Sequence, residues 1–124
     1  MSVVGDEAEK AVANALSAMG FDLVYQSKGS RGAFDLLATH GALQLGIQVK
    51  RSPLPLRFNR NEWSRMVAEG RSLRWHWIVA SVNPSGEVNM LDPAKASVKK
   101  SITLAGKAVI SNLLLWLDQK GSLA

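Results

Sequence analysis

The sequence predicts a single α/β domain, and three observations lead to that prediction. The chain has 124 residues, which is the length of one ordinary domain and too short for two independent cores. Residues 6–19 show the apolar spacing of an amphipathic helix. Residues 34–50 alternate apolar and polar side chains on both sides of His40-Gly41, which is the pattern of two paired strands.

Composition restricts the classes of protein to which the chain can belong. Hydrophobic residues make up 47% of the chain and charged residues 20%, which is typical of a globular protein. No apolar run approaches the roughly 20 residues that span a bilayer, and residues 1–10 lack the pattern of a secretory signal. There are no cysteines for disulfides or thiolate metal sites. We therefore expect a cytoplasmic protein without membrane association.

Positive charge is concentrated in the middle of the chain. The net charge is +5, and the segment 50–74 holds seven cations against the two acids Glu62 and Glu69. The cations are Lys50, Arg51, Arg57, Arg60, Arg65, Arg71 and Arg74. Such a segment favours a phosphate-rich partner, because cations release condensed counterions from nucleic acid. We expect Arg51, Arg57, Arg60 and Arg65 to contact DNA; a merely solubilising surface is the alternative.

The first predicted helix places an acid beside its apolar face. Glu9 shares a face with Val12, Ala13 and Leu16, so its carboxylate is expected at the margin of the core. Gly20 is expected to end the helix. A strand over residues 21–26 and a polar loop over residues 27–32 follow. A solvated helix acid is the alternative interpretation of Glu9.

The alternating segment 34–50 predicts a β-hairpin with one apolar face. If His40-Gly41 is the two-residue turn, Phe34, Leu36 and Ala38 lie opposite Ile47, Leu45 and Leu43 on that face. The other face then carries Asp35 opposite Gly46, with Gln48 and Lys50 further along the same side. Glycine opposite a carboxylate would leave room for a cation or a phosphate. An ordinary solvated strand face is the alternative for Gln48 and Lys50.

The rest of the chain predicts two more helices and two more strands. The expected elements are a loop over residues 51–58, a helix from a cap at Asn59 or Asn61 to a stop at Gly70, a central strand over 75–82, an edge strand over 87–91 and a last helix over 106–119. The last helix has a wide apolar surface, which the sheet or another subunit must cover. Trp63, Trp75, Trp77 and Trp116 are expected in the core, with base stacking as the alternative.

The polar residues of the hairpin and first helix suit metal-dependent phosphodiester hydrolysis. That reaction needs hard cations, which prefer oxygen ligands. Asp35 and Glu9 supply carboxylates, Gln48 a side-chain carbonyl and Val49 a backbone carbonyl. Lys50 would orient the attacking water or stabilise the pentacovalent phosphate.

These motifs resemble the PD-(D/E)xK nuclease superfamily, and within it most resemble the archaeal Holliday-junction resolvases. The match covers roughly Gly5 to Asp92, through GDEAEKAVANALSAMGF, KGSRGAFDLLA and GIQVKRS. By this resemblance Glu9 corresponds to the helix carboxylate, Asp35 to the metal-binding aspartate and Lys50 to the catalytic lysine. The residues Ser30 and Arg31 fall in the loop that in the family approaches the scissile phosphate. The family usually has Glu where this chain has Gln48, so the signature reads QVK and one negative charge is missing.

The resemblance implies a fold, a cofactor and a partner. The fold would be a restriction-endonuclease-like central mixed β-sheet flanked by helices, with an extra C-terminal helix after the match. The protein would be a homodimer that uses Mg²⁺, with Mn²⁺ as a substitute, and cleaves Holliday junctions or other branched DNA. One alternative is a nuclease for duplex or single-stranded DNA. The other is a catalytically silent DNA-binding or assembly protein on a nuclease fold, which the neutral Gln48 favours.

Overall fold

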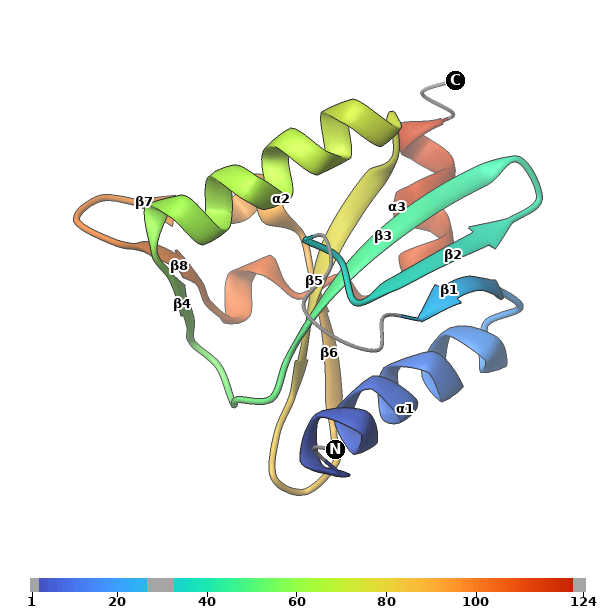
Figure 1. Ribbon diagram of the computed structural model, residues 1–124, viewed down its shortest axis with the longest axis horizontal. Coiled ribbons are helices and arrows are strands. Elements are labelled where there is room, and N and C mark those ends of the chain that lie inside the picture. Colours follow the sequence, from blue (N-terminus) through green and yellow to red (C-terminus); the bar gives the residue numbers. More distant parts are fainter. Residues whose placement is uncertain (1–2, 27–32, 122–124) are drawn as a thin grey trace.

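A five-stranded mixed sheet with helices on both faces forms the centre of the molecule (Figure 1). The structure is a computed structural model and describes residues 3–26 and 33–121. The helices are α1 (Val3–Ala18), α2 (Arg60–Leu73) and α3 (Leu113–Lys120), with 3₁₀ turns η1 (Pro93–Lys95) and η2 (Gly106–Ala108). The strands are β1 (Asp22–Gln26), β2 (Leu36–His40), β3 (Leu43–Lys50), β4 (Leu56–Phe58), β5 (His76–Val82), β6 (Val88–Leu91), β7 (Ser97–Val98) and β8 (Ile102–Leu104). No helix in these two ranges is long and apolar enough to cross a bilayer.

The central sheet has the strand order β1-β2-β3-β5-β6. Strands β3 and β5 run parallel and the other neighbours run antiparallel. The connection from β3 to β5 passes through α2, as a parallel pair requires a crossover. The sheet is therefore mixed, as predicted.

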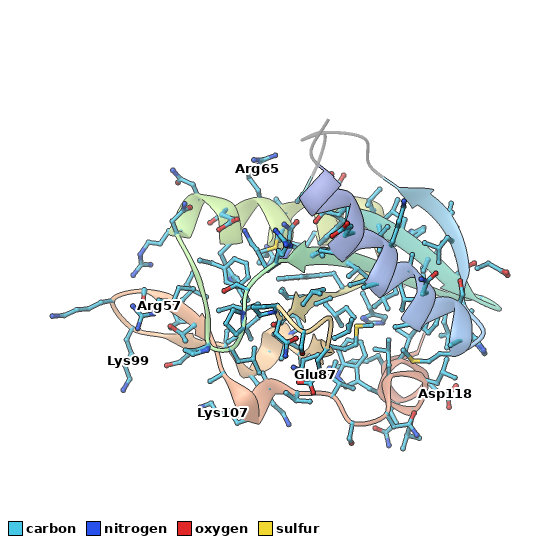
Figure 2. The ribbon with its side chains drawn as sticks, turned by 90° about the horizontal axis from the view of Figure 1, so that it is seen from below. Arg57, Arg65, Glu87, Lys99, Lys107 and Asp118 are labelled. Carbon is cyan, nitrogen blue, oxygen red and sulfur yellow. The ribbon has the colours of Figure 1, made fainter. Side chains whose placement is uncertain are left out.

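Two hydrophobic clusters cover the two faces of this sheet. On one face, Val12 and Leu16 of α1 and Leu113 and Leu117 of α3 pack against the strands. On the other face, Met66 of α2 packs together with a small second sheet of order β4-β8-β7. Figure 2, seen from below, separates α2 and the small sheet from α1 and α3. The sheet is consequently buried on both sides along its centre.

The β2–β3 hairpin is shifted by two residues from the predicted register. His40 pairs with Leu43, so Gly41-Ala42 is the turn, and Leu36 lies opposite Ile47. Gly41 has φ +61°, as expected for glycine at the first central position of a type II′ turn. Because the shift is an even number of residues, Gln48 and Lys50 keep their predicted side of the sheet.

Phe34 and Gly46 depart from the predicted hairpin. Phe34 precedes β2 and packs in the α2 cluster instead of on the α1 face with Leu36. Gly46 lies opposite Leu37, not Asp35. A Cβ on Gly46 would lie 2.8 Å from Cδ2 of Phe34, so the aromatic ring fills the space that was expected for a cation. The prediction of an open space at Gly46 was wrong.

Replacing Gly46 by Ala should lower the free energy of unfolding by about 1–3 kcal/mol, because the new methyl group overlaps a buried ring. Denaturant titration followed by circular dichroism measures the change. Gly106→Ala is the matched control, since a Cβ there meets no atom within 4 Å. Equal stability of the Gly46 variant and the control would contradict this packing.

Helix α2 begins where predicted but extends beyond Gly70. The side chain of Asn59 caps the helix by accepting a hydrogen bond from the Glu62 N–H at 2.7 Å. Gly70 was expected to end the helix, yet the helix runs to Leu73 and Arg74 is its C-cap. A Cβ on Gly70 would lie 2.7 Å from Cδ1 of Trp77. Gly70 therefore allows the indole ring of Trp77 to pack closely on the helix, and it does not end the helix.

The C-terminal region differs most from the prediction. Instead of one helix over residues 106–119, the chain forms η2, a short extended segment and the eight-residue α3, which is capped by Asn112. Strands β4, β7 and β8 were not predicted, because strands of two or three residues show too little alternation to be recognised. The wide apolar surface expected of the last helix is mostly covered within the chain, although Leu115 is 52% exposed.

Both edges of the central sheet are irregular. In β1, Leu23 pairs with Ala38 and Tyr25 with Leu37, so Val24 is the extra residue of a β-bulge. At the other edge, the segment 108–110 runs beside the end of β6 and bonds to its backbone. Its Ile110 N–H donates to the Met90 carbonyl at 2.8 Å.

Candidate active site

Asp35 lies at the bend immediately before β2, beside the end of β3. Its backbone N–H donates to the Ile47 carbonyl at 2.9 Å. Its side-chain Oδ2 accepts a hydrogen bond from the Val49 N–H at 2.8 Å. The first bond holds the backbone of Asp35 beside β3, and the second fixes its carboxylate one residue before the strand ends at Lys50. The predicted neighbours Asp35 and Val49 are therefore brought together, through the amide of Val49.

The electrostatic environment of Asp35 is unfavourable for its charge. Burial raises the pKa of this carboxyl above its usual 3.8, and the Val49 hydrogen bond and the positive charge of Lys50 only partly offset that effect. A cation bound beside this half-buried carboxyl would stabilise its charged form.

Asp35→Asn should make the metal-free protein more stable at neutral pH. The folded-state pKa lies above the unfolded value of 3.8, so the penalty of the charged form is complete above the folded pKa and disappears below about pH 3.8. Asparagine removes this charge and can still accept from Val49. We expect a higher midpoint of thermal unfolding for the variant at pH 7 in chelator, at about 4 °C per kcal/mol. The difference should shrink toward pH 4; a less stable variant at pH 7 would refute the prediction.

Lys50, at the end of β3, is paired with a carboxylate from α2. Its Nζ donates to Oε2 of Glu62 and lies 5.2 Å from the ring centre of Phe58. Both charged side chains are about one-third exposed. The ion pair holds the ammonium group toward α2 and gives this part of the site a second carboxylate. From the sequence, Glu62 is recognised only as one of the two acids in the basic segment 50–74.

The signal that could have found Glu62 is its position in α2. It lies three residues after the cap Asn59, in the first turn of the helix that follows β3 and β4. A chain that returns from β3 into this helix brings the first turn near the end of β3. The pairing with Lys50 itself depends on the length and path of the intervening loop, which no local pattern reveals.

Gln48 lies on β3 between the residues that anchor Asp35. It is half-buried and pairs in the ladder with Val79 of β5, while Val49 pairs with Ala80. Val79 belongs to the cluster on the α2 side of the sheet. Alternation along β3 places Gln48 on the same side as Lys50, as predicted. Its role as a ligand stays a prediction.

The other predicted site residues come from more distant parts of the chain. Glu9 is half-buried on α1, next to Ala8 of the core cluster on the face opposite α2. Its assignment to the site stays a prediction. Ser30 and Arg31 lie outside the described residues.

The chemistry of these side chains fits a weakly held divalent cation. Asp35 offers its Oδ1 and a second lone pair on Oδ2, and Gln48 offers an amide oxygen, which are the hard donors that Mg²⁺ prefers. No group of three or more His, Cys, Asp and Glu side chains in residues 3–26 and 33–121 is placed to hold a metal ion. A cation here would therefore rely on amide, backbone and phosphate oxygens in addition to Asp35.

The basic segment presents its cations to solvent and turns both acids inward. The side chains of Arg51, Arg57, Arg60, Arg65, Arg71 and Arg74 are all exposed. Glu62 binds Lys50, and Glu69 accepts hydrogen bonds from the backbone N–H groups of Ala33 and Phe34. In Figure 2, Arg65 extends outward from α2, and Arg57 and Lys99 are both seen at the side of the small sheet. Because both acids of the segment are bound within the protein, the side chains that it exposes to solvent carry mostly positive charge.

The fold belongs to the class predicted, a restriction-endonuclease-like mixed sheet flanked by helices. Among solved structures the chain is similar to Hjc, a Holliday junction resolvase from the archaeal hyperthermophile Archaeoglobus fulgidus, with a TM-score of 0.67 and 22% sequence identity. The similarity covers 82% of this chain and 86% of Hjc. The resemblance to archaeal resolvases is thus confirmed at the level of the fold. No protein-family model and no curated protein matches the sequence.

Proposed function

We propose that the protein is a metal-dependent DNA endonuclease that acts on Holliday junctions or other branched DNA. The observation that carries the proposal is the arrangement at the end of β3, where the half-buried carboxylate of Asp35 is fixed to Val49 beside Lys50. That arrangement occurs in a fold similar to that of a resolvase. The exposed cations of the segment 50–74 support a phosphate-rich substrate.

Each residue of the proposed site has a distinct task. Asp35 and Gln48 would hold the metal ion, with the Val49 carbonyl and Glu9 as further oxygen donors. Mg²⁺, when bound, supplies positive charge that activates water and neutralises the phosphate. Lys50 positions the attacking water or the phosphate oxygens, and Glu62 orients its ammonium group.

A cleavage assay on matched substrates tests the proposal. A four-way junction, a fork, a duplex and a single strand of related sequence are incubated with the protein and Mg²⁺ or Mn²⁺. We expect cleavage of the branched substrates, and none by Asp35→Ala under the same conditions. Preferential cleavage of the plain duplex or single strand would replace the branched-DNA assignment with that of a general nuclease. Equal cleavage by the variant would show that the activity is not that of this site.

A catalytically silent DNA-binding or assembly protein is the second candidate. Two observations favour it: Gln48 is neutral, and the ammonium group of Lys50 is already paired with Glu62. This candidate would bind the four-way junction in an electrophoretic assay and leave it intact with every divalent metal.

Arg57, Arg60 and Arg65 are expected to contribute to DNA affinity and not to cleavage of bound DNA. Their side chains are exposed, and Arg60 makes one long hydrogen bond, 3.4 Å, to the Lys99 carbonyl. Neutralising one residue that contacts a phosphate should weaken binding to all sequences and reduce the slope of log K against log salt by about 1. Fluorescence anisotropy over about 50 to 200 mM salt measures that slope. If all three single variants keep the parental slope, the segment is not part of the interface.

The proposal includes a homodimer. Support comes from the resemblance to resolvases and from Leu115, which remains exposed on α3. A twofold dimer would present two equivalent sites to a junction.

A further inference from the structure

A pocket of about 540 Å³ lies at the end of the molecule remote from Lys50. It opens between the end of α2, the start of β5, η1 and α3. Figure 1 shows these ends of α2, β5 and α3 near one another. Trp77 is four residues from Ser81, the ladder partner of Lys50, so the pocket is about 13 Å from the candidate site at 3.3 Å per residue. Six side chains matter for its chemistry: Trp75, Trp77, Trp116, Arg71, Arg74 and Lys120. We call it the tryptophan pocket.

Two of the three indole rings in the tryptophan pocket, those of Trp77 and Trp116, are held by contacts with neighbouring side chains. Trp77 packs against Phe34 and Trp63, with ring centres 5.9 and 5.3 Å apart. The Trp116 Nε1–H donates to Oδ2 of Asp92 at 3.2 Å, and Asp92 is buried. All of these tryptophans are only partly buried, so apolar ring surface remains at the pocket. Fixed aromatic rings bind planar ligands at low cost in conformational entropy.

The charge of the tryptophan pocket is positive. Arg71, Arg74 and Lys120 are exposed at its margin, and none of them forms an ion pair with a carboxylate in the described ranges. The acid in the lining, Asp92, already accepts from the Ala94 N–H as well as from Trp116. An anionic group of a ligand would therefore meet three cations that have no carboxylate partner, one of which, Lys120, lies with its Nζ 5.2 Å from the ring centre of Trp116.

Arg74 occupies a backbone position that usually takes glycine. It caps the end of α2 with φ +58° and ψ +42°, the left-handed conformation. A long cationic side chain is uncommon there. This position also allows the charge to be removed without backbone strain, because glycine adopts the same conformation readily.

We propose that the tryptophan pocket binds a nucleotide, with the base against the indole rings and the phosphate among the three cations. The volume is in the range of about 300–1,000 Å³ typical of small-ligand sites. Aromatic rings next to cations are the combination that binds bases and phosphates together. The nucleotide is either free or an unpaired residue of a DNA strand. This inference does not depend on the nuclease proposal, since none of the proposed active-site residues and none of the arginines expected to contact DNA line the pocket.

Nuclear magnetic resonance of the tryptophan indole N–H groups tests the inference directly. Deoxyadenosine monophosphate, deoxyadenosine and deoxyribose 5-phosphate are titrated separately into the full chain. We expect the monophosphate to shift the indole signals of the pocket tryptophans and to bind about ten-fold or more tightly than either fragment. Trp63 packs on Trp77 but does not line the pocket, so its signal should shift less than those of the three pocket tryptophans. Equal affinity for the monophosphate and the sugar phosphate would overturn the proposal, because it would leave no role for the base.

A second pair of ligands distinguishes the two sources of the nucleotide. A hexamer of deoxyadenylate is compared with an abasic hexamer of the same charge. Binding of the base-containing hexamer alone assigns the pocket to an unpaired residue of a strand, whereas binding of the free monophosphate assigns it to a free nucleotide. If neither the monophosphate nor the base-containing hexamer shifts the pocket signals, the proposal is wrong.

Substitutions of the pocket cations test whether the phosphate of the ligand lies beside them. Arg74→Gly and Lys120→Gln should each weaken binding of whichever ligand binds by about ten-fold. Lys107→Gln, which removes an exposed charge that does not line the pocket, should leave the affinity unchanged. Equal losses in all three variants would overturn the assignment and indicate only attraction to a basic protein.

Discussion

Asp35→Asn is expected to lower the rate of DNA cleavage by about 10³-fold or more, which corresponds to about 4 kcal/mol of activation free energy. The substitution removes the half-buried negative charge that would attract the cation, while the asparagine oxygen can keep the hydrogen bond from Val49. DNA binding should be as tight as in the parent or tighter, because repulsion between the carboxylate and the phosphate is also lost. Single-turnover cleavage and anisotropy binding on one labelled junction measure the two effects.

Thermal unfolding shows whether Asp35→Asn loses cleavage because it no longer binds the metal or because it is misfolded. In Mg²⁺ titrations of thermal stability, the parent should gain stability and Asp35→Asn should not, because only a bound ion stabilises the native state. The variant is also expected to be at least as stable as the parent in chelator at neutral pH. Cleavage at the parental rate by a folded Asp35→Asn would remove Asp35 from the active site.

Gln48→Leu is expected to reduce cleavage nearly as much, and Gln48→Glu to have the opposite effect on metal dependence. Leucine removes the amide oxygen, whereas glutamate is almost the same size as glutamine and adds the negative charge that is usual here in the nuclease superfamily that the sequence resembles. The glutamate variant should therefore need less Mg²⁺ for half-maximal cleavage, by about ten-fold for each 1.4 kcal/mol gained in binding. Paired Mg²⁺ titrations of cleavage by the two variants and the parent give the comparison.

The outcomes of the Gln48 experiment separate the candidate functions. Parental activity in Gln48→Leu would make this residue an ordinary polar side chain of the strand. If the parent is inert at every metal concentration and Gln48→Glu cleaves, the natural protein binds DNA without cutting it. In that case the Lys50–Glu62 ion pair would belong to a DNA-binding surface and would have no catalytic role.

The fold could be predicted wherever the sequence pattern extends over several turns or strand residues. Helix α1 and strands β3 and β5 fall within a few residues of their expected ranges, because their periodicities are long. The small sheet could not be foreseen, since β7 has two residues and β8 three. Gly70 was misinterpreted because a glycine that ends a helix and one that accepts a neighbouring ring look the same in sequence; the ring of Trp77 decides between them.

The candidate site was predictable in its strand residues and not in its helix partner. Alternation alone places Gln48 and Lys50 on one side of β3, and a register error of two residues does not change that side. The same error predicted Gly46 as the partner of Asp35 in the hairpin. Which residues lie opposite each other depends on which two residues form the turn, and the sequence pattern does not determine that. The contact between Lys50 and Glu62 spans 12 residues and depends on the path of the loop between them. Local patterns carry no information on such a contact.

The irregular edges of the central sheet have a consequence for assembly. A regular, open edge strand offers a row of unpaired backbone groups on which another chain can extend the sheet, and this route leads to aggregation. Here the bulge at Val24 interrupts that row along β1, and the segment 108–110 occupies part of the opposite edge beside β6. Growth of a continuous sheet from chain to chain is therefore disfavoured at both edges. Association of two copies would instead have to bury side chains, so its strength should respond to substitutions at exposed apolar residues such as Leu115.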